Sequence, residues 1–147
     1  VMPAFKSTVS IIERNVPPHS PVNYDSMQFT RSDRVSTTAT IRAGYDTGFS
    51  QYAFKESSDV LIRGQRFPVL GKTSMNMVVI DITDEDPHNK IQLGDDVVLV
   101  GKQGKEQITW DEFAKRNHMG ITEQVLLIGN QNHRVIINSS KNGQKIE

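Results

Sequence analysis

The feature that most constrains the fold is the placing of large aliphatic residues at every second position of residues 77–83, at Val78, Ile80 and Ile82. In an extended chain, Val78, Ile80 and Ile82 point to one side and the residues between them point to the other. This is the pattern of a β-strand with one buried face. The apolar run at residues 67–70 precedes it and predicts a partner strand. The two strands together predict a hairpin at the centre of the chain.

A small polar turn, Thr73–Asn76, joins the two predicted strands after Gly71. Its residues are not all committed to strand pairing, so its backbone N–H groups are available to bind a ligand. An ordinary tight turn accounts for the same residues. The pattern alone does not choose between a binding turn and a structural one.

Further strands are predicted where β-branched and aromatic residues cluster between turn-forming residues. They are Phe5–Arg14, Val22–Thr30, Val35–Ala43, Asp59–Ile62, Gly94–Gly101, Glu106–Ile108, Thr122–Ile128 and Arg134–Asn138. One short helix is predicted near residues 110–118, because Thr109 and Glu112 have the spacing of a capping box and Gly120 provides a stop. We therefore predict an all-β fold, a Greek-key-like β-barrel or sandwich with one short helix, as a single β-domain over residues 1–147.

The charge balance and the residue types exclude several classes of protein. Lys+Arg and Asp+Glu are both 17, so the chain lacks the basic surplus of a general nucleic-acid or anionic-membrane binder. It has no cysteine, which is compatible with a cytoplasmic location, and no apolar run near the ~20 residues of a membrane span. The four histidines do not have metal-ligand spacing, so we predict no metal site. Because the chain opens at Val1 without an initiator or a signal peptide, we expect a piece of a longer protein.

Seven short motifs follow one another along the chain. They are Phe5 with Val22-x-Tyr24, Ala39-Thr40-Ile41, Gly44-Tyr45-x-x-Gly48, Gly64-Gln65-Arg66-x-Pro68-Val69-x-Gly71, Ser74-Met75-Asn76, Leu93-Gly94-Asp95-x-Val97 and Gly101-x-Gln103-Gly104. In this order and at this spacing they resemble the C-terminal domain of bacterial alanine racemases. The resemblance covers nearly the whole chain, from Pro3 to about Ile137.

This resemblance implies a two-domain enzyme that uses pyridoxal 5′-phosphate and works as a head-to-tail homodimer. In the family, an N-terminal (β/α) barrel carries the lysine that binds the cofactor, and the C-terminal β-domain completes the active site of the partner subunit. This chain contains no such barrel, so we expect it to be inactive alone. The implied reaction interconverts L- and D-alanine, which supplies D-alanine for peptidoglycan.

Three residues take their implied roles from the family motifs. Racemisation needs a base on each face of the substrate α-carbon, and Tyr24 matches the tyrosine that serves as the base from the opposite subunit. Met75 matches the residue whose backbone N–H contacts the substrate carboxylate. Tyr45 matches a tyrosine at the inner mouth of the substrate channel. Without the resemblance, Tyr24 is a half-buried strand residue and Tyr45 is a packing residue of its turn.

The chain departs from the family pattern at several positions. Asn76 stands where the family has an aspartate beside the substrate, and Gln51 stands where an arginine is common. The spacing from Tyr24 to Tyr45 is two residues longer than usual. The family tyrosine that contacts the cofactor phosphate falls on Glu123, whose negative charge is unfavourable beside a phosphate. Either Glu123 points elsewhere or is protonated, or the register differs by one, or the cofactor or substrate is bound differently.

Three functions remain open from the sequence. The first is an alanine racemase, represented by its C-terminal domain. The second is a racemase of serine, lysine or a broad range of amino acids, which the departures at Asn76 and Glu123 favour. The third is a non-catalytic β-barrel module used for association, which the missing barrel favours.

Overall fold

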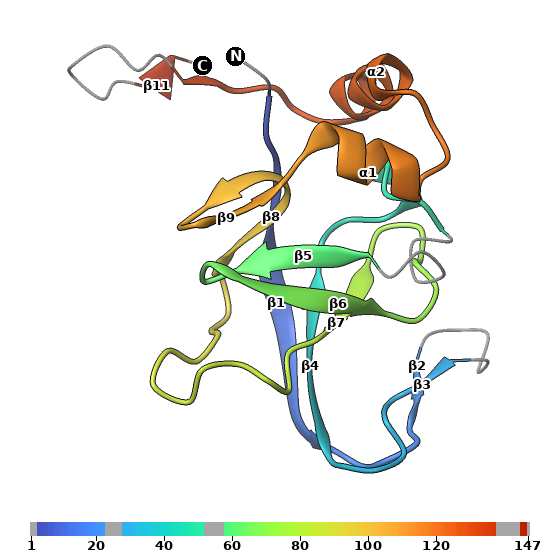
Figure 1. The fold of residues 1–147 in the computed structure, drawn as a ribbon, viewed down its shortest axis with the longest axis vertical. Helices are drawn as coiled ribbons and strands as arrows, with labels where there is room; N and C mark the ends of the chain where they lie inside the picture. Colours follow the sequence, from blue (N-terminus) through green and yellow to red (C-terminus); the bar gives the residue numbers. More distant parts are fainter. Residues whose placement is uncertain (1–2, 23–27, 52–57, 138–144, 147) are drawn as a thin grey trace.

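The computed structural model describes residues 3–22, 28–51, 58–137 and 145–146 (Figure 1). In chain order the elements are β1 (Phe5–Val16), β2 (Pro21–Val22), β3 (Gln28–Phe29), β4 (Ser36–Ile41), the 3₁₀ turn η1 (Tyr45–Thr47), β5 (Asp59–Ile62), β6 (Gln65–Leu70), β7 (Val78–Asp81), β8 (Asp96–Gln103), β9 (Glu106–Ile108), α1 (Trp110–Arg116), α2 (Ile121–Gln131), β10 (Ile136–Ile137) and β11 (Lys145–Ile146).

Strand β1 closes the main sheet into a barrel. The sheet has the order β1-β4-β7-β6-β5-β8-β9, and β1 also pairs with β8 at the other side. Residues Phe5–Thr8 of β1 pair with β8, whereas the part from Val9 onward pairs with β4. The register of β1 is irregular between Val9 and Ile11, where the strand changes partner. Bulges of this kind are typical of a strand that bends. The prediction of a mainly β fold with a barrel is confirmed.

The alternation in β7 produces the predicted buried face. Val78 is 1% exposed and both Ile80 and Ile82 are fully buried, whereas Val79 lies half-buried on the other face. Fully burying an aliphatic side chain of this size contributes about 1.5–3 kcal/mol to folding. The central hairpin therefore anchors the barrel core.

The apolar run of β8 is buried on both faces of the sheet. Val97 and Leu99 belong to the main core. Val98 points the other way and packs with Leu61 and Ile108 in a second small cluster, which β9 covers. This arrangement explains why β8 lacks the polar alternation seen in β7.

Helix α1 begins as the sequence predicts and covers one end of the barrel (Figure 1). The Thr109 side chain accepts a hydrogen bond from the Glu112 backbone N–H at 3.1 Å. The buried Phe113 ring lies with its centroid 6.3 Å from that of Phe5 and 5.7 Å from that of Phe49. The helix ends at Arg116, so the predicted stop at Gly120 is wrong.

Gly120 is instead the N-cap of a second helix, α2, and the predicted strand Thr122–Ile128 is wrong. Gln124 and Ile128 are buried one turn apart, whereas Leu126 on the opposite side is 59% exposed. This is a helical period, but the consecutive apolar residues at positions 125–128 hide it. A short apolar run does not distinguish a strand from a helix, and packing against the rest of the domain decides in favour of the helix.

The predicted single strand Val22–Thr30 is also wrong. Val22 pairs with Gln28 in antiparallel register, so β2 and β3 are two short strands of a hairpin. Next to this pair, the Thr30 N–H donates a hydrogen bond to the Ser20 carbonyl at 2.8 Å. The strand predicted at 134–138 is shorter in the described residues, where β10 spans Ile136–Ile137 and pairs with β11.

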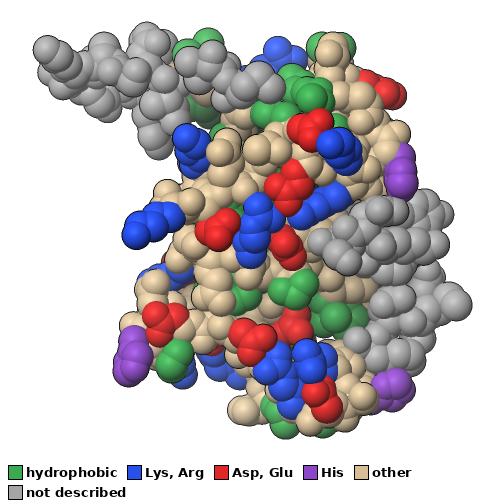
Figure 2. All heavy atoms as spheres, in the orientation of Figure 1, with side chains coloured by type: hydrophobic (Ala, Val, Ile, Leu, Met, Phe, Trp, Pro, Cys, Tyr) green, Lys and Arg blue, Asp and Glu red, His purple; other side chains and the backbone are tan. Residues whose placement is uncertain are grey.

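Arg66 on β6 joins three elements at the surface of the barrel. Its guanidinium lies 2.8 Å from the Glu112 carboxylate of α1 and 3.2 Å from that of Glu106 on β9, and it donates to the Gln107 carbonyl at 2.6 Å. Figure 2 shows basic and acidic side chains interspersed on one face of the molecule. Burial raises the pKa of Glu112, but the hydrogen bond from Arg66 and the charge of Arg116 outweigh it and hold the pKa below its ordinary value of 4.5. The ionised pair therefore stabilises the fold above pH 4.5, and this contribution is lost as the pH falls through the lowered pKa.

We predict that Arg66→Met lowers the free energy of unfolding at pH 7 by about 1–2 kcal/mol, because Glu112 loses a partly buried charged partner. The difference from the wild type should shrink at pH 3, below the ordinary pKa of 4.5, because the contribution of the ionised pair is lost as the pH falls through the lowered pKa of Glu112. Urea unfolding followed by circular dichroism at both pH values measures it. Arg31→Met is the matched control, since Arg31 pairs with Asp33 in full contact with solvent and should cause no measurable change. An equal loss at both pH values would contradict the assigned role of Glu112.

Candidate functional site

The compact turn that carries Tyr45 follows β4. The Gly44 N–H donates to the Thr47 hydroxyl at 3.0 Å, and the Phe49 N–H donates to the Gly44 carbonyl at 2.9 Å. Phe49 is 2% exposed and anchors the turn in the core. Tyr45 itself is 47% exposed. The turn is therefore fixed at its base and presents the tyrosine ring at the surface.

The polar turn between β6 and β7 has exposed residues at its tip, whereas much of its backbone is hydrogen-bonded within the domain. The Ser74 N–H donates to the Met77 carbonyl at 3.0 Å, and the Thr73 N–H donates to the Gln51 carbonyl at 3.3 Å. Met75 is 54% exposed and Asn76 is also exposed. Within the described part of the chain, the N–H groups of Met75 and Asn76 have no hydrogen-bond acceptor. These are the donors that a turn of this kind can offer to an anion.

Strand register brings these two turns to the same end of the barrel. Ile41, the last residue of β4, pairs with Val78, the first residue of β7, and Leu70 at the end of β6 pairs with Val79. The segments that follow β4 and β6 must therefore leave the sheet side by side. Sequence alone gave no indication of this register.

The two turns pack backbone against backbone. The Tyr45 N–H donates to the Ser74 carbonyl at 3.2 Å, and the Asp46 N–H donates to the Met75 carbonyl at 3.0 Å. A Cβ atom on Gly44 would lie 2.1 Å from the Met75 carbonyl oxygen. Only glycine allows this approach, so Gly44 is a site residue; the sequence marked it as part of the motif Gly44-Tyr45-x-x-Gly48 and gave it no role of its own.

Three further residues were predicted to belong to the site, namely Tyr24, Asn76 and Glu123. Tyr24 lies between β2 and β3, outside the described residues, so its relation to Tyr45 and Met75 stays a prediction. Asn76 is adjacent to Met75 and exposed. Glu123 is in the first turn of α2, with an exposed side chain that has no ion-pair partner among the described residues.

Helix α2 rests on the turn that carries Tyr45. The Gln124 side chain donates to the Gly48 carbonyl at 3.2 Å, and the Asn132 side chain donates to the Thr47 carbonyl at 2.9 Å. These contacts were missed at the sequence level because residues 122–128 read as a strand. They connect the second helix to the exposed pair of turns.

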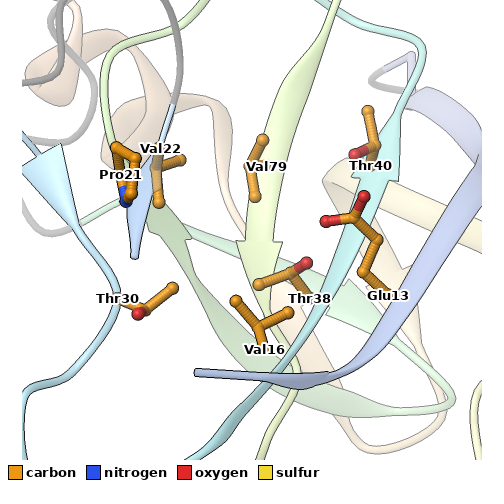
Figure 3. Close-up of a pocket in the computed structure, with 8 residues that line it drawn as sticks. All are labelled: Glu13, Val16, Pro21, Val22, Thr30, Thr38, Thr40 and Val79. Carbon is orange, nitrogen blue, oxygen red and sulfur yellow. The ribbon is translucent and has the colours of Figure 1, made fainter. Parts of the chain in front are cut away.

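A separate cavity of about 120 Å³ lies between the outer face of the barrel and the β2–β3 hairpin (Figure 3). Figure 3 shows Glu13 and the two threonines of β4 on one side and residues of the hairpin region on the other. Its lining residues are Glu13, Val16, Pro21, Val22, Thr30, Thr38, Thr40 and Val79. Neither Tyr45 nor Met75 contributes to it, and no motif of the sequence analysis falls on it apart from Val22 and Thr40.

Among the described residues, no three histidine, aspartate or glutamate side chains gather closely enough to hold a metal ion. No helix in this part of the chain has the length and apolar character needed to cross a membrane.

The chain matches known proteins over nearly its whole length. Residues 2–136 match the family model described as alanine racemase, C-terminal domain. The lysine racemase of Proteus mirabilis is 41% identical over 133 residues, which is 90% of this chain and 31% of that protein. The broad specificity amino-acid racemase of Pseudomonas taetrolens is 36% identical over 132 residues, again 90% of this chain and 31% of that protein.

Solved structures share the fold. The crystal structure of alanine racemase from Bacillus anthracis with bound L-Ala-P superposes with a TM-score of 0.82 at 26% identity, covering 98% of this chain and 34% of that one. The present chain therefore spans about a third of the length of the proteins that it matches.

We predict that Gly44→Ala destabilises the protein by about 1–3 kcal/mol, because the added methyl group forces the Tyr45 turn away from Met75. Thermal or urea unfolding measures the change. Gly120→Ala is the matched control, since a Cβ there meets no atom within 4 Å and the backbone has a negative φ. If both substitutions had the same small effect, the close packing of the two turns would be contradicted.

Proposed function

Because this chain belongs to the family of alanine racemase C-terminal domains, we propose that it completes the active site of a pyridoxal-phosphate-dependent amino-acid racemase. The observation that carries the proposal is the exposed pair of turns, in which the Met75 N–H lies beside the Tyr45 turn and has no hydrogen-bond acceptor among the described residues. In a head-to-tail homodimer, this face would meet the barrel domain of the partner subunit. The chain alone would be inactive, because the cofactor-binding barrel lies outside it.

The Met75 N–H is suited to bind the substrate carboxylate. A backbone donor that has no internal acceptor loses no hydrogen bond when an anion arrives, and a bond to a charged acceptor is stronger than a neutral one. The adjacent Asn76 N–H is equally unbonded within the described residues. The interaction uses the backbone and so does not depend on the methionine side chain.

The exposed apolar side chains at this face are suited to contact another domain. Tyr45, Met75 and Met77 are 47%, 54% and 37% exposed, although each is only a few positions along the chain from a residue of the barrel core. Apolar groups gathered on a surface typically mark a contact region. We assign this region to the barrel domain of the partner subunit, which would also exclude water from the substrate.

Tyr24 would act as the base on one face of the substrate α-carbon. A free phenol has a pKa of about 10, so it accepts a proton near neutrality only beside cationic groups. In this proposal, those groups come from the barrel domain of the partner subunit. This is a second reason to expect no activity from the present chain alone.

Glu123 does not fit a contact with the cofactor phosphate. It matches the position of the family tyrosine, and its exposed carboxylate has no cationic partner among the described residues. An anion cannot donate a hydrogen bond to a phosphate and repels its charge. We therefore assign the binding of the cofactor mainly to the barrel domain.

We further propose that the substrate range extends beyond alanine. Asn76 replaces a carboxylate beside the substrate with a neutral amide, and Glu123 replaces a tyrosine with an acid. Two similar relatives are a lysine racemase and a broad specificity racemase. An alanine racemase that supplies D-alanine is the second candidate, which the likeness to the Bacillus anthracis structure favours.

We predict that Tyr24→Phe in the full-length enzyme lowers kcat by about 10²–10⁴-fold in at least one direction, because one of the two bases is lost. The absorbance of the bound cofactor should stay intact. Circular dichroism of each enantiomer during turnover measures both directions. Unaltered racemisation in both directions would remove Tyr24 from the catalytic role.

A substrate panel tests the proposed range. We expect the full-length enzyme to racemise lysine or serine with a kcat/KM within about tenfold of the alanine value, which corresponds to less than about 1.4 kcal/mol of discrimination. Chiral chromatography of the products from L-alanine, L-serine, L-lysine and L-arginine measures this range. A preference for alanine by several orders of magnitude would favour the second candidate.

A further inference from the structure

Gln124 is a fully buried polar side chain with both ends of its amide in use. Its exposed fraction is 0%. The amide oxygen accepts a hydrogen bond from the Asn117 side chain at 2.6 Å, and the amide nitrogen donates to the Gly48 carbonyl at 3.2 Å. Gln124 therefore links the C-terminal end of α1 to the turn that carries Tyr45.

A second side-chain amide, at the end of the same helix, hydrogen-bonds to the same turn. Asn132, the C-cap of α2, donates to the Thr47 carbonyl at 2.9 Å and to the Ile128 carbonyl at 2.8 Å. Ile128 also fills the space against Gly48, where a Cβ atom would lie only 2.8 Å from it. Two consecutive carbonyl groups of the turn are thus held by side chains of α2.

The Tyr45 turn also holds the backbone of Met75. The Tyr45 and Asp46 N–H groups donate to the Ser74 and Met75 carbonyls, and the Gly44 backbone lies directly against Met75. A displacement of the Tyr45 turn therefore displaces the Met75 peptide as well. The path from Gln124 to Met75 consists of hydrogen bonds and backbone contacts.

We propose that Gln124 is a positioning residue that fixes the Tyr45 ring and the Met75 N–H for substrate binding; this inference rests on the proposed racemase function. Gln124 does not touch the substrate. It holds one side of the Tyr45 turn from within the domain, while Gly44 and Phe49 hold the other. A neutral amide suits this position because it donates to Gly48 and accepts from Asn117 at the same time.

The test uses the full-length enzyme with its cofactor and the variant Gln124→Met, which keeps the volume but removes both hydrogen bonds. We expect KM to rise by about tenfold or more with a smaller change in kcat, because binding of the carboxylate by Met75 is lost in the ground state and the transition state alike. Hydrogen exchange should accelerate at residues 44–48 and 73–77. Gln107→Met is the matched control, because Gln107 is an exposed glutamine on β9 and should change neither quantity.

Two further variants test whether Gln124 positions the two turns if Gln124→Met fails to fold. Asn132→Ala removes both hydrogen bonds of a half-buried side chain and should raise KM by a smaller factor than Gln124→Met does. Gln124→Glu introduces a carboxyl that donates to Gly48 only when it is protonated. The ratio of its KM to the wild-type KM at the same pH should therefore fall towards one as the pH is lowered.

Each outcome is decisive. Unchanged KM and unchanged exchange at residues 44–48 in Gln124→Met would overturn the proposal. So would an acceleration of exchange spread evenly over the chain, since that shows loss of global stability. If the wild type racemises no amino acid, the proposed function fails, whereas the exchange at residues 44–48 and 73–77 still decides whether Gln124 holds the two turns.

Discussion

Closure of the barrel by β1 is the constraint on which the candidate site depends. One strand pairs with β8 through its first residues and with β4 through the rest. This fixes the order β4-β7-β6 and the register of Ile41 with Val78. The turn after β4 and the turn after β6 then emerge together at the end that the helices cover. The exposed face is thus a consequence of the sheet topology, and α2 secures it from the side.

The two turns combine a rigid support with an open surface. Backbone contacts at Gly44 and the hydrogen bonds of Gln124 and Asn132 lie on the inner side. The exposed side chains of Tyr45 and Met75 lie on the outer side, and the Met75 N–H has no hydrogen-bond acceptor among the described residues. Binding groups that are held in place before the ligand arrives cost less ordering on binding. This division suits a domain that supplies a few contacts to a site formed mainly by another subunit.

The sequence predicted the parts of this fold in which local pattern and tertiary packing agree. The alternation of β7, the strand boundaries of β5 and β9 and the Thr109 cap are confirmed. The strand predicted over 122–128 fails because four consecutive apolar residues fit either structure, and only packing on the Tyr45 turn selects the helix. The sequence also did not predict the hairpin of β2 and β3, because a run of strand-forming residues does not show where the chain reverses. It missed the role of Gly44 because that role depends on contact with Met75, which is distant in the chain.

A structure of the full-length enzyme with a bound, unreactive amino-acid analogue tests the central claim most directly. Our account predicts that the Met75 backbone nitrogen of one subunit lies at hydrogen-bonding distance, about 2.9 Å, from the analogue's carboxylate in the partner's site. Tyr24 and Tyr45 should line the same site. If the face formed by residues 44–48 and 73–77 were instead open to solvent, with the carboxylate bound elsewhere, the account would be contradicted.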